Sequence, residues 1–411
     1  MEILVVSAHA PYDGIGKAGE KTHNYYLKQL KTHGNNVYTI CFCNKTDENK
    51  LDFEKYGIEN AVFVESNNKC IQMINKIKRL VHIAVFPNDK YANFVPHYKV
   101  KYIRAQIERY IASGKRPDCI ILEWTHMILL VDIIRKYFPS VPIVASSHDV
   151  NYVGSRRYWE QENNFFVKYF RKKQHLNLKK REIVALSKCD VIVSQNENDI
   201  NILKANDLLK NKKYYRIVPY YDNYGSIRRN PKENIIIFYG AMDRSENYKS
   251  VQWFIENVFS KLKDYQFIIM GGNPTQDIKR YVSPNIKVTG FLPIEEVQHY
   301  FSICKCMVVP LRLGSGIKVK ILEAFSAGIP VLTNEIGIEG ILADAGREYF
   351  HCETPDEYLS VLNDLQTAKI DSEKIGENAK QFVKVKHNLE ESALNYMQML
   401  NTICNQSKKV I

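Results

Sequence analysis

The chain has 411 residues, 45% of them apolar and 25% charged, and these are the proportions of a globular protein. They exclude a disordered tail, a collagen-like repeat and a small disulfide-rich scaffold, and at about 100 to 200 residues per domain the length predicts two domains. The 57 Lys and Arg residues exceed the 45 Asp and Glu residues, and the formal charge of +12 favours anionic partners such as nucleotides, polyprenyl phosphates, phospholipids or nucleic acid.

The first part of the chain alternates strand-like runs with helical patterns. Strands are expected at residues 2–7, 36–43, 119–124, 142–147 and 190–195, and a helix at 19–32. This alternation is typical of a parallel sheet covered by helices on both faces. The sequence opens with a strand and lacks the basic start and long apolar segment of a signal peptide, and no apolar run approaches the roughly 20 residues that cross a bilayer. We therefore expect a cytoplasmic protein.

Two stretches in this part are rich in basic residues. Residues 68–110 mix Lys and Arg with Ile, Leu, Val and Phe, which predicts an amphipathic insertion. Residues 168–181 contain seven basic residues and no acidic one. A solvated helix face explains this run as well as a surface for a membrane or an acidic substrate does. On the second interpretation, the protein contacts the inner face of an anionic membrane peripherally.

The second part of the chain restarts the same pattern after a linker. Periodicity is lost at 215–219 and 222–234, so we expect a linker at 219–232 between a domain at 1–218 and a domain at 233–385. Residues 371–405 are expected to be helical, and the segment 386–411 is expected to pack as a terminal helix back across the domains. Strands are expected at 234–240, 266–272, 285–290, 306–310, 329–334 and 348–352, and a helix at 247–261.

The run at residues 308–341 carries the clearest chemical signal. A strand is followed by a Gly-Ser-Gly loop at 314–316 and by a helix expected at 317–327. Glycines let the backbone approach a ligand closely, and the free N–H groups at a helix start attract phosphate. Lys320 and Glu323 follow on neighbouring turns, where the ammonium could meet a diphosphate and the carboxylate a ribose diol. An ordinary surface ion pair is the alternative for these two residues.

The block GSGIKVKILEAFSAGIPVLTN, which contains this loop and helix, resembles the carboxyl-terminal half of glycosyltransferase family 4. So do GAMDRSENYKSVQWF, IIMGGNP and NIKVTGFLP before it, and SSHDV at 146–150 and REIVALSKCDVIVS at 181–194 extend the resemblance to most of the chain. The resemblance implies a GT-B fold, an α/β fold in which two Rossmann-like domains face each other across a cleft. It also implies a retaining transfer of a sugar from a nucleotide-diphosphate sugar, bound mainly by the carboxyl-terminal domain, to an acceptor hydroxyl at the amino-terminal domain.

Positions that match the family imply roles for individual residues. Glu323 corresponds to the glutamate that holds the ribose, Lys320 to a basic residue near the donor phosphates, and His148 to a histidine near the transferred sugar. His148 followed by Asp149 could instead simply cap a loop.

A glycine-rich loop follows the first strand. Gly14, Gly16 and Gly19 lie where the family has its acceptor loop. As a bare G-x-G-x-x-G pattern they would also suggest a dinucleotide site, but no clear acidic partner follows the second strand. The resemblance therefore assigns these glycines to acceptor binding.

The chain departs from the family pattern at two positions. Ser315 stands where many members have a first glutamate, so the donor sugar cannot be inferred from that residue. Ala241 stands where many members have an arginine, and of the nearby cations we prefer Arg244 to Lys249 as its replacement because Arg244 is closer to the strand end. The expected donor-binding residues are Gly240, Lys249, Gly272, Asn273, Gly290, Phe291, Gly314, Ser315, Gly316 and Ile317, and the expected catalytic group is His148, Arg244, Lys320 and Glu323.

The chemistry expected from these residues uses neither a metal nor a cofactor besides the nucleotide sugar. The sequence has no Asp-x-Asp pair to hold a metal, so Lys320, Arg244 and the helix amides after Gly316 would stabilise the departing diphosphate. The resemblance implies that the leaving phosphate helps to deprotonate the acceptor hydroxyl on the same face of the sugar. His148 would position or polarise the sugar and would not act as a nucleophile.

Two other functions fit the same sequence. A nucleotide-sugar epimerase or a phosphorylase can share this fold, and a basic, non-catalytic binding protein could use a degenerate transferase scaffold. No zinc-finger or RNP-like motif supports nucleic acid as a partner. A composition heavy in Lys, Asn and Ile suggests a bacterial protein, and the basic surface favours a glycan, lipid-linked or other hydroxyl-bearing acceptor in the assembly of a surface polysaccharide.

Overall fold

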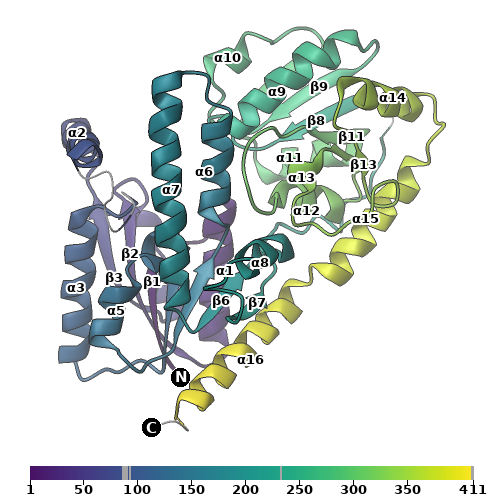
Figure 1. Cartoon of the computed structure of the whole chain (residues 1–411). Coiled ribbons are helices and arrows are strands. Elements are labelled where there is room, and N and C mark those ends of the chain that lie inside the picture. Colours follow the sequence, from purple (N-terminus) through teal and green to yellow (C-terminus); the bar gives the residue numbers. More distant parts are fainter. Residues whose placement is uncertain (86–90, 92–93, 232–233, 409–411) are drawn as a thin grey trace. The chain divides into compact units, whose positions relative to one another are not determined.

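The computed structural model describes the chain apart from residues 86–90, 92–93, 232–233 and 409–411 (Figure 1). The chain divides into two compact units. Unit 1 comprises Met1–Tyr220 and Leu389–Ile411, and unit 2 comprises Tyr221–Asn388. The first division lies inside the segment 219–232, where a linker was expected, and the carboxyl-terminal segment groups with the amino-terminal unit.

Unit 1 is built on a seven-stranded parallel sheet with the strand order β3-β2-β1-β4-β5-β6-β7. The inner strands are apolar runs that are buried on both faces, as is usual for parallel sheets. The strands are β1 (Glu2–Ser7), β2 (Asn36–Asn44), β3 (Glu59–Glu65), β4 (Cys119–Glu123), β5 (Ile143–Ser147), β6 (Val191–Ser194) and β7 (Lys213–Arg216).

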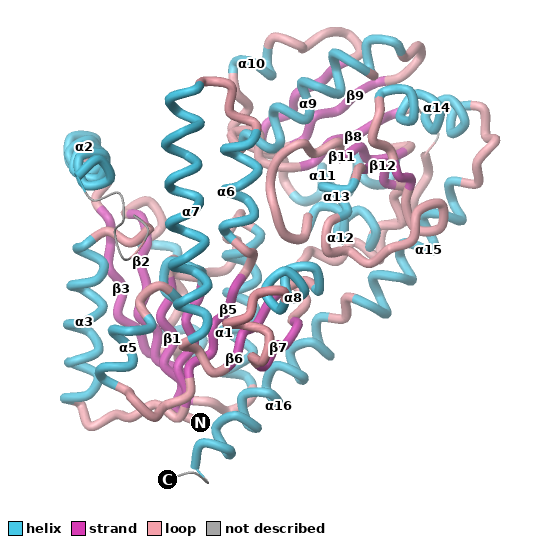
Figure 2. Tube along the Cα trace, viewed as in Figure 1, coloured by secondary structure: helices cyan, strands magenta, loops and turns pink. Residues whose placement is uncertain are grey.

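Helices cover both faces of this sheet, and each face has its own apolar cluster (Figure 2). One cluster includes side chains of α3, α5 and α7, and the other includes side chains of α1 and α16. The helices of unit 1 are α1 (Ala18–Thr32), α2 (Lys69–Val85), α3 (His97–Ala112), α4 (Trp124–Ile128), α5 (Val131–Tyr137), α6 (Asn151–Glu160), α7 (Phe165–Ser187), α8 (Glu197–Lys204) and α16 (Leu389–Lys408).

Unit 2 repeats this plan on a six-stranded parallel sheet with the strand order β10-β9-β8-β11-β12-β13. Its strands are β8 (Ile235–Tyr239), β9 (Gln266–Met270), β10 (Ile286–Gly290), β11 (Cys306–Val309), β12 (Val331–Thr333) and β13 (Phe350–His351). Its helices are α9 (Ser245–Asn257), α10 (Gln276–Lys279), α11 (Ile294–Ile303), α12 (Val319–Ser326), α13 (Glu335–Ile338), α14 (Pro355–Gln366) and α15 (Ser372–Lys386).

Both sheets reverse their direction of growth near the middle. Unit 1 switches between β1 and β4, and unit 2 switches between β8 and β11. In open parallel sheets, ligands bind outside the carboxyl ends of the strands at this switch. The topology confirms the expected α/β class with two Rossmann-like domains. It also directs attention to the edge of each sheet that is formed by the carboxyl ends of its strands, which we call the edge of the unit.

Two strands of unit 1 were not predicted. β3 and β7 lie at the edges of the sheet and are only partly buried, so neither carries the apolar run that marks a central strand. The expectation that periodicity is lost at 215–219 is wrong for the first two of these residues, because β7 continues to Arg216.

The expectation that residues 371–405 are helical is confirmed except for a short break, which divides the segment into two helices. α15 ends at Lys386 and α16 begins at Leu389. Between them the backbone of His387 leaves the helical region, its side chain is buried, and its carbonyl oxygen accepts a hydrogen bond from the Tyr221 hydroxyl at 3.2 Å. None of the helices, as far as the structure describes them, is long and apolar enough to span a membrane.

Candidate functional site

The end of β8 requires a glycine because a lysine ammonium lies directly against it. Gly240 follows β8 with a φ of +152°. A Cβ atom at this position would lie 2.6 Å from Lys320 Nζ, closer than real Cβ contacts, and 3.0 Å from Asn247 Nδ2, which is also a tight contact. The absence of a side chain at Gly240 therefore lets Lys320 reach the carboxyl end of the sheet.

Lys320 is the second residue of α12 and is fixed in this place by two contacts. Its Nζ donates a hydrogen bond to Asn247 Oδ1 at 2.7 Å and lies 4.4 Å from the centre of the Phe238 ring. Burial of the ammonium group, followed by the nearby charge of Arg244, lowers the pKa of Lys320 to about 7. A bound diphosphate would favour the protonated form, because an opposite charge stabilises an ammonium.

Glu323 lies one turn further along α12 and is 5% exposed. Its Oε1 accepts a hydrogen bond from the backbone N–H of Asp222 at 3.5 Å. The phenol of Tyr239 lies near both Glu323 and Asp222. Its burial, together with the charges of these two carboxylates, raises the pKa of Tyr239 well above its usual range. Neither Lys320 nor Glu323 has the exposure of a surface ion pair.

The Gly-Ser-Gly loop lies against the start of α9. Gly314 and Gly316 both have positive φ angles, of +106° and +74°. A Cβ atom at Gly314 would lie 3.8 Å from Lys318 Cε and 4.0 Å from Glu246 Cβ. The Lys318 ammonium donates to the carbonyl of Gly316, which ties the loop to the residue that precedes α12.

The two cations considered as replacements for the family arginine differ in position. Arg244 precedes the first turn of α9 and forms an ion pair with Glu246. Lys249 is exposed further along α9. Arg244 also contributes to the low pKa of Lys320, so its charge is felt at the end of β8.

The other expected donor-binding residues follow neighbouring strands at the same edge. A Cβ atom at Gly271 would lie 1.9 Å from the carbonyl oxygen of Gly240, so the ends of β8 and β9 touch. Gly272, Asn273 and Gly290 come at the ends of β9 and β10, Phe291 is 86% exposed, and Ser315 and Ile317 lie in the loop before α12. The structure thus brings the sequence-predicted residues of unit 2 to one edge of its sheet.

In unit 1 the corresponding edge holds a histidine whose two ring nitrogens both have protein partners. His148 follows β5, and its Nε2 donates to Glu123 Oε2 at 2.8 Å. The side-chain amide of Gln195 donates to His148 Nδ1 at 2.7 Å. The ring of Trp124 stacks on the imidazole with a centroid distance of 4.4 Å and an interplanar angle of 7°. His148 is thereby held in one orientation.

Glu123 is the buried centre of this arrangement. Its Oε1 lies 3.6 Å from His23 Nδ1, and its Oε2 accepts from His148. Burial alone would raise the pKa of Glu123, but His23 and His148 hold it well below its usual range. Trp124, which follows Glu123, has a positive φ of +67° and makes T-shaped ring contacts with His9 and His23. A carboxylate, three imidazoles and an indole therefore gather at the switch point between β1 and β4.

Glu123, Trp124 and Gln195 were not singled out from the sequence. The segment 119–124 was expected to be a strand throughout, but the strand ends at Glu123, and Trp124 begins α4. One sequence feature could have identified Glu123: it is a polar residue at the carboxyl end of a buried strand, and ligands of parallel sheets bind at such ends. The pairing of Gln195 with His148 joins residues 47 apart in the chain and left no local pattern.

Of the three glycines of the amino-terminal loop, one touches this cluster. A Cβ atom at Gly19 would lie 3.5 Å from both His148 Nδ1 and Trp124 Nε1, whereas Gly14 and Gly16 have nothing within 4 Å of that position. Gly14 has a φ of +78°, which favours glycine. Gly14 and Gly16 thus border open space, whereas Gly19 allows the backbone to lie close to His148 and Trp124.

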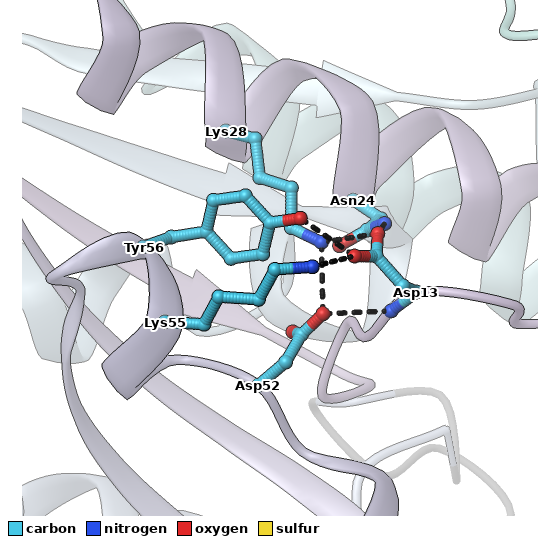
Figure 3. Close-up of polar contacts among 6 residues, drawn as sticks. All are labelled: Asp13, Asn24, Lys28, Asp52, Lys55 and Tyr56. Carbon is cyan, nitrogen blue, oxygen red and sulfur yellow. Dashed lines mark hydrogen bonds and ion pairs between the residues drawn. The ribbon is translucent and has the colours of Figure 1, made fainter.

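The loop is anchored at Asp13 (Figure 3). One carboxylate oxygen of Asp13 accepts from Lys28 Nζ at 2.5 Å, and the other accepts from the Tyr56 hydroxyl at 2.6 Å and from Lys55 Nζ at 3.3 Å. The backbone N–H of Asp13 donates to Asp52 Oδ2 at 3.0 Å. Hydrogen bonds from Lys28 and Tyr56 hold the pKa of Asp13 well below its usual range. This network fixes the start of the glycine loop to α1 and to the segment after β2.

Glu182 fixes the chain where it leaves β5, at the same carboxyl-terminal end of the sheet as His148. It lies on α7, within the block that resembles the family, and is buried. Its carboxyl group accepts hydrogen bonds from the Thr125 hydroxyl at 2.8 Å and from the backbone N–H groups of Asn151 and Tyr152 at 3.2 and 3.1 Å. The start of α6, just after His148, is fixed in this way.

Among the residues that the structure describes, no three or more His, Cys, Asp or Glu side chains are grouped to hold a metal ion.

Comparison with known families adds the activity of unit 2. Residues 233–366 match the family model described as Glycosyl transferases group 1. The match covers nearly all strands and helices that form the edge around Lys320 and Glu323, and it identifies unit 2 as a glycosyltransferase domain. No curated protein sequence matches the chain.

Solved structures share the fold at low sequence identity. Sucrose-phosphate synthase from Thermosynechococcus elongatus is 14% identical with a TM-score of 0.68, and the match covers 98% of each chain. A glycosyltransferase from Rickettsia africae is 14% identical with a TM-score of 0.62 and the same coverage. HepE from Anabaena in complex with UDP is 13% identical with a TM-score of 0.64, over 98% of this chain and all of HepE. This likeness shows the fold, which is of the expected GT-B class.

Proposed function

We propose that the chain is a retaining glycosyltransferase that moves a sugar from a nucleotide-diphosphate sugar to an acceptor hydroxyl. One observation carries the proposal: the Lys320 ammonium lies at the glycine end of β8, with Glu323 one turn behind it, inside the segment that matches the transferase family. A cation at that edge suits a diphosphate, and a buried carboxylate beside it suits a ribose diol.

Transfer requires that the departing diphosphate is stabilised as negative charge grows on it. Lys320, Arg244 and the free N–H groups at the start of α12 are the donors proposed for this task. Each well-placed donor of this kind contributes about 3 kcal/mol to such a transition state. We propose that these groups act without a metal and without a further cofactor.

The amino-terminal unit supplies the groups proposed for the acceptor and the transferred sugar. Retention would follow if the leaving phosphate helps to remove the acceptor proton on the same face of the sugar. His148 would position or polarise the reacting groups, and its fixed ring supports a positioning role. Gly14, Gly16 and Gly19 are proposed to border the acceptor.

UDP is the first nucleotide to test, because HepE, which shares the fold, has been crystallised with UDP and with UDP-glucose. The acceptor is proposed to be a glycan, lipid-linked or other hydroxyl-bearing molecule in the assembly of a bacterial surface polysaccharide. The formal charge of +12 supports an anionic acceptor and a peripheral contact with the inner face of a membrane.

The experiment measures nucleotide release and sugar products from a panel of nucleotide sugars, with and without candidate acceptors. A transferase releases nucleotide slowly from donor alone and faster with acceptor, and the Glu323→Ala variant should lose at least about 99% of this turnover. Conversion of donor alone into an epimer would instead favour an epimerase. Release of a sugar 1-phosphate from a glycan in the presence of inorganic phosphate would favour a phosphorylase. An unchanged biological activity in Glu323→Ala would favour a non-catalytic binding protein.

A further inference from the structure

The start of α7 leaves four aromatic side chains in water. Phe165, Phe166, Tyr169 and Phe170 are 77%, 73%, 51% and 61% exposed. Their rings contact one another in two pairs, Phe165 with Phe166 and Tyr169 with Phe170. Exposed aromatic side chains in such a group forgo burial that the fold could otherwise gain, so a contiguous patch of them marks a surface that is covered by something.

Basic side chains continue the same helix face. Phe166, Lys173 and Lys180 are spaced by seven residues and therefore share one side of α7, whereas His175 and Leu178 are buried against the protein. The basic residues of the segment are Lys168, Arg171, Lys172, Lys173, Lys179, Lys180 and Arg181, and five of them, Arg171, Lys172, Lys173, Lys179 and Lys180, are exposed. The free side of α7 is thus aromatic at its tip and cationic along its length.

A second apolar surface lies on α2. Met73, Ile77 and Val81 are spaced by four residues and, with Ile74, occupy one side of the helix. They are 62%, 53%, 57% and 50% exposed. α2 falls in the segment 68–110, which was expected to be an amphipathic insertion. Lys90, one of the basic residues of that segment, lies outside the described residues.

Both surfaces leave the sheet of unit 1 at the edge that carries the acceptor residues. α2 follows the carboxyl end of β3, and the α6–α7 hairpin follows the carboxyl end of β5. In a parallel sheet these ends share one edge, which is also where His148 and the glycine loop lie. Figure 1 shows the α6–α7 hairpin standing beyond this end of the sheet.

We propose that the tip of α7 and the apolar side of α2 dock unit 1 on an anionic lipid bilayer. Phe165, Phe166 and Phe170 enter the region of the lipid headgroups, and Lys172 and Lys173 contact anionic phosphates. The proposal rests on the proposed function in one respect: docking through this edge brings the acceptor residues to a membrane-borne acceptor.

Charge distinguishes the bilayer from the main competing occupant, a second copy of the chain. A two-fold contact through this patch would bring the same cationic helix of each copy together, and the like charges would repel. An anionic bilayer supplies both an apolar interior for the aromatic tip and negative charge for the lysines behind it.

The test is cosedimentation of the full chain with phosphatidylcholine vesicles, with and without phosphatidylglycerol. The wild-type protein should bind the anionic vesicles at least about tenfold more tightly, and salt near 1 M, which shortens the Debye length to about 3 Å, should weaken binding. The triple variant Phe165→Ser, Phe166→Ser, Phe170→Ser should lose at least about tenfold in binding while its melting temperature stays unchanged. Leu208→Ser is the matched control, because Leu208 is 60% exposed between α8 and β7, at the opposite edge of the sheet, and this variant should bind like the wild type.

Three outcomes would overturn the proposal. Equal binding to neutral and anionic vesicles would contradict the role of the lysines, and wild-type binding by the triple variant would contradict the role of the aromatic tip. A dimer that forms without vesicles and is lost in the triple variant would assign the patch to a second copy. Nucleotide release from donor alone is measured in parallel, so that an inactive protein that still binds vesicles would refute the proposed function and leave the docking surface intact.

Discussion

Glu123 Oε2 accepts a hydrogen bond from His148 Nε2 at 2.8 Å, across the carboxyl ends of two adjacent strands of unit 1. Because a carboxylate can only accept, the His148 proton in this pair is on Nε2. Gln195 occupies the other ring nitrogen and Trp124 covers one face of the ring. We therefore expect His148 to work through a fixed orientation that Glu123 determines.

Replacing Glu123 by Gln should lower kcat at least about tenfold and change the donor KM by less than about threefold. The amide retains the size of the side chain but loses the charge that orients His148, so the effect should fall on the transition state. Steady-state kinetics on a donor and acceptor pair measures both constants. Asp132→Asn, an exposed carboxylate on α5 that pairs with Lys188, is the control and should leave both constants unchanged. A Glu123→Gln variant with wild-type kcat would rule out the positioning role.

The affinity for a nucleotide sugar should decrease as the pH rises above 7. Burial lowers the pKa of Lys320 to about 7, and the bound diphosphate favours the protonated ammonium. Affinity should therefore be constant below about pH 6 and fall by up to about tenfold per pH unit above pH 7, until the raised pKa of the bound state is reached. Calorimetric titration with UDP-glucose at several pH values measures this affinity. The diphosphate of UDP-glucose does not itself change protonation between about pH 6 and 9, so the pH dependence reports on the protein. Lys320→Arg keeps its charge, so its profile should be flat; a flat wild-type profile would contradict the assignment.

Gly240→Ala should weaken nucleotide binding by at least about tenfold, because the new methyl group would lie 2.6 Å from Lys320 Nζ and displace the ammonium. The positive φ of Gly240 adds backbone strain of about 1 kcal/mol or more to the loss of folding stability. Gly346→Ala separates the two effects, since Gly346 also has a positive φ but nothing lies within 4 Å of its Cβ position. Denaturant unfolding measures the backbone strain of each variant separately, and only Gly240→Ala should lose binding. Equal binding by the two variants would count against the close approach.

Asp13→Ala should release the glycine loop of unit 1. The variant removes the acceptor of hydrogen bonds from Lys28, Lys55 and Tyr56, but the network is partly exposed, so we expect a loss of folding stability of only about 1 kcal/mol or less. The clearer readout is the rate of tryptic cleavage after Lys17, followed by mass spectrometry, which should increase. Asp207→Asn, which alters an ion pair whose carboxylate is 95% exposed, should cleave like the wild type. An unchanged rate in Asp13→Ala would show that the loop is held by other contacts.

The stability of the protein should carry a contribution from Glu182 that is lost on raising the pH. Burial raises the pKa of Glu182 to about 8 from an ordinary value of 4.5. Between these values the folded state holds a proton that the unfolded state releases, so the free energy of unfolding falls as the pH rises from about 5 to 8. Urea unfolding of the wild type and of Glu182→Gln at several pH values measures the difference. The difference between the two proteins should change with pH in this range, and parallel curves would contradict the raised pKa.

The central strands and the donor edge could be predicted from sequence for a physical reason. Strands such as β4 and β8 are buried on both faces and therefore read as continuous apolar runs. The Gly-Ser-Gly loop and the spacing of Lys320 and Glu323 lie within one short segment, so a local pattern marks the edge to which they belong.

The parts that could not be predicted depend on contacts between distant residues. Asn247 holds Lys320 across 73 positions of the chain, and Gln195 holds His148 across 47. The break between α15 and α16 depends on the burial of His387 and on its contact with Tyr221, 166 positions away. Local propensity carries no trace of such partners, and for this reason the residues that orient the candidate catalytic groups emerged only from the structure.

Calorimetric titration of the wild-type protein and two variants with a panel of nucleotide-diphosphate sugars tests the account most directly. At least one donor should bind the wild type, and Lys320→Gln and Glu323→Gln should each weaken that binding by about tenfold or more without unfolding the protein. Glu295→Gln, an exposed carboxylate on α11 of the same unit, should bind like the wild type. If every donor binds all four proteins equally, or if none binds the wild type, then the edge of unit 2 around Lys320 and Glu323 is not a nucleotide-sugar site.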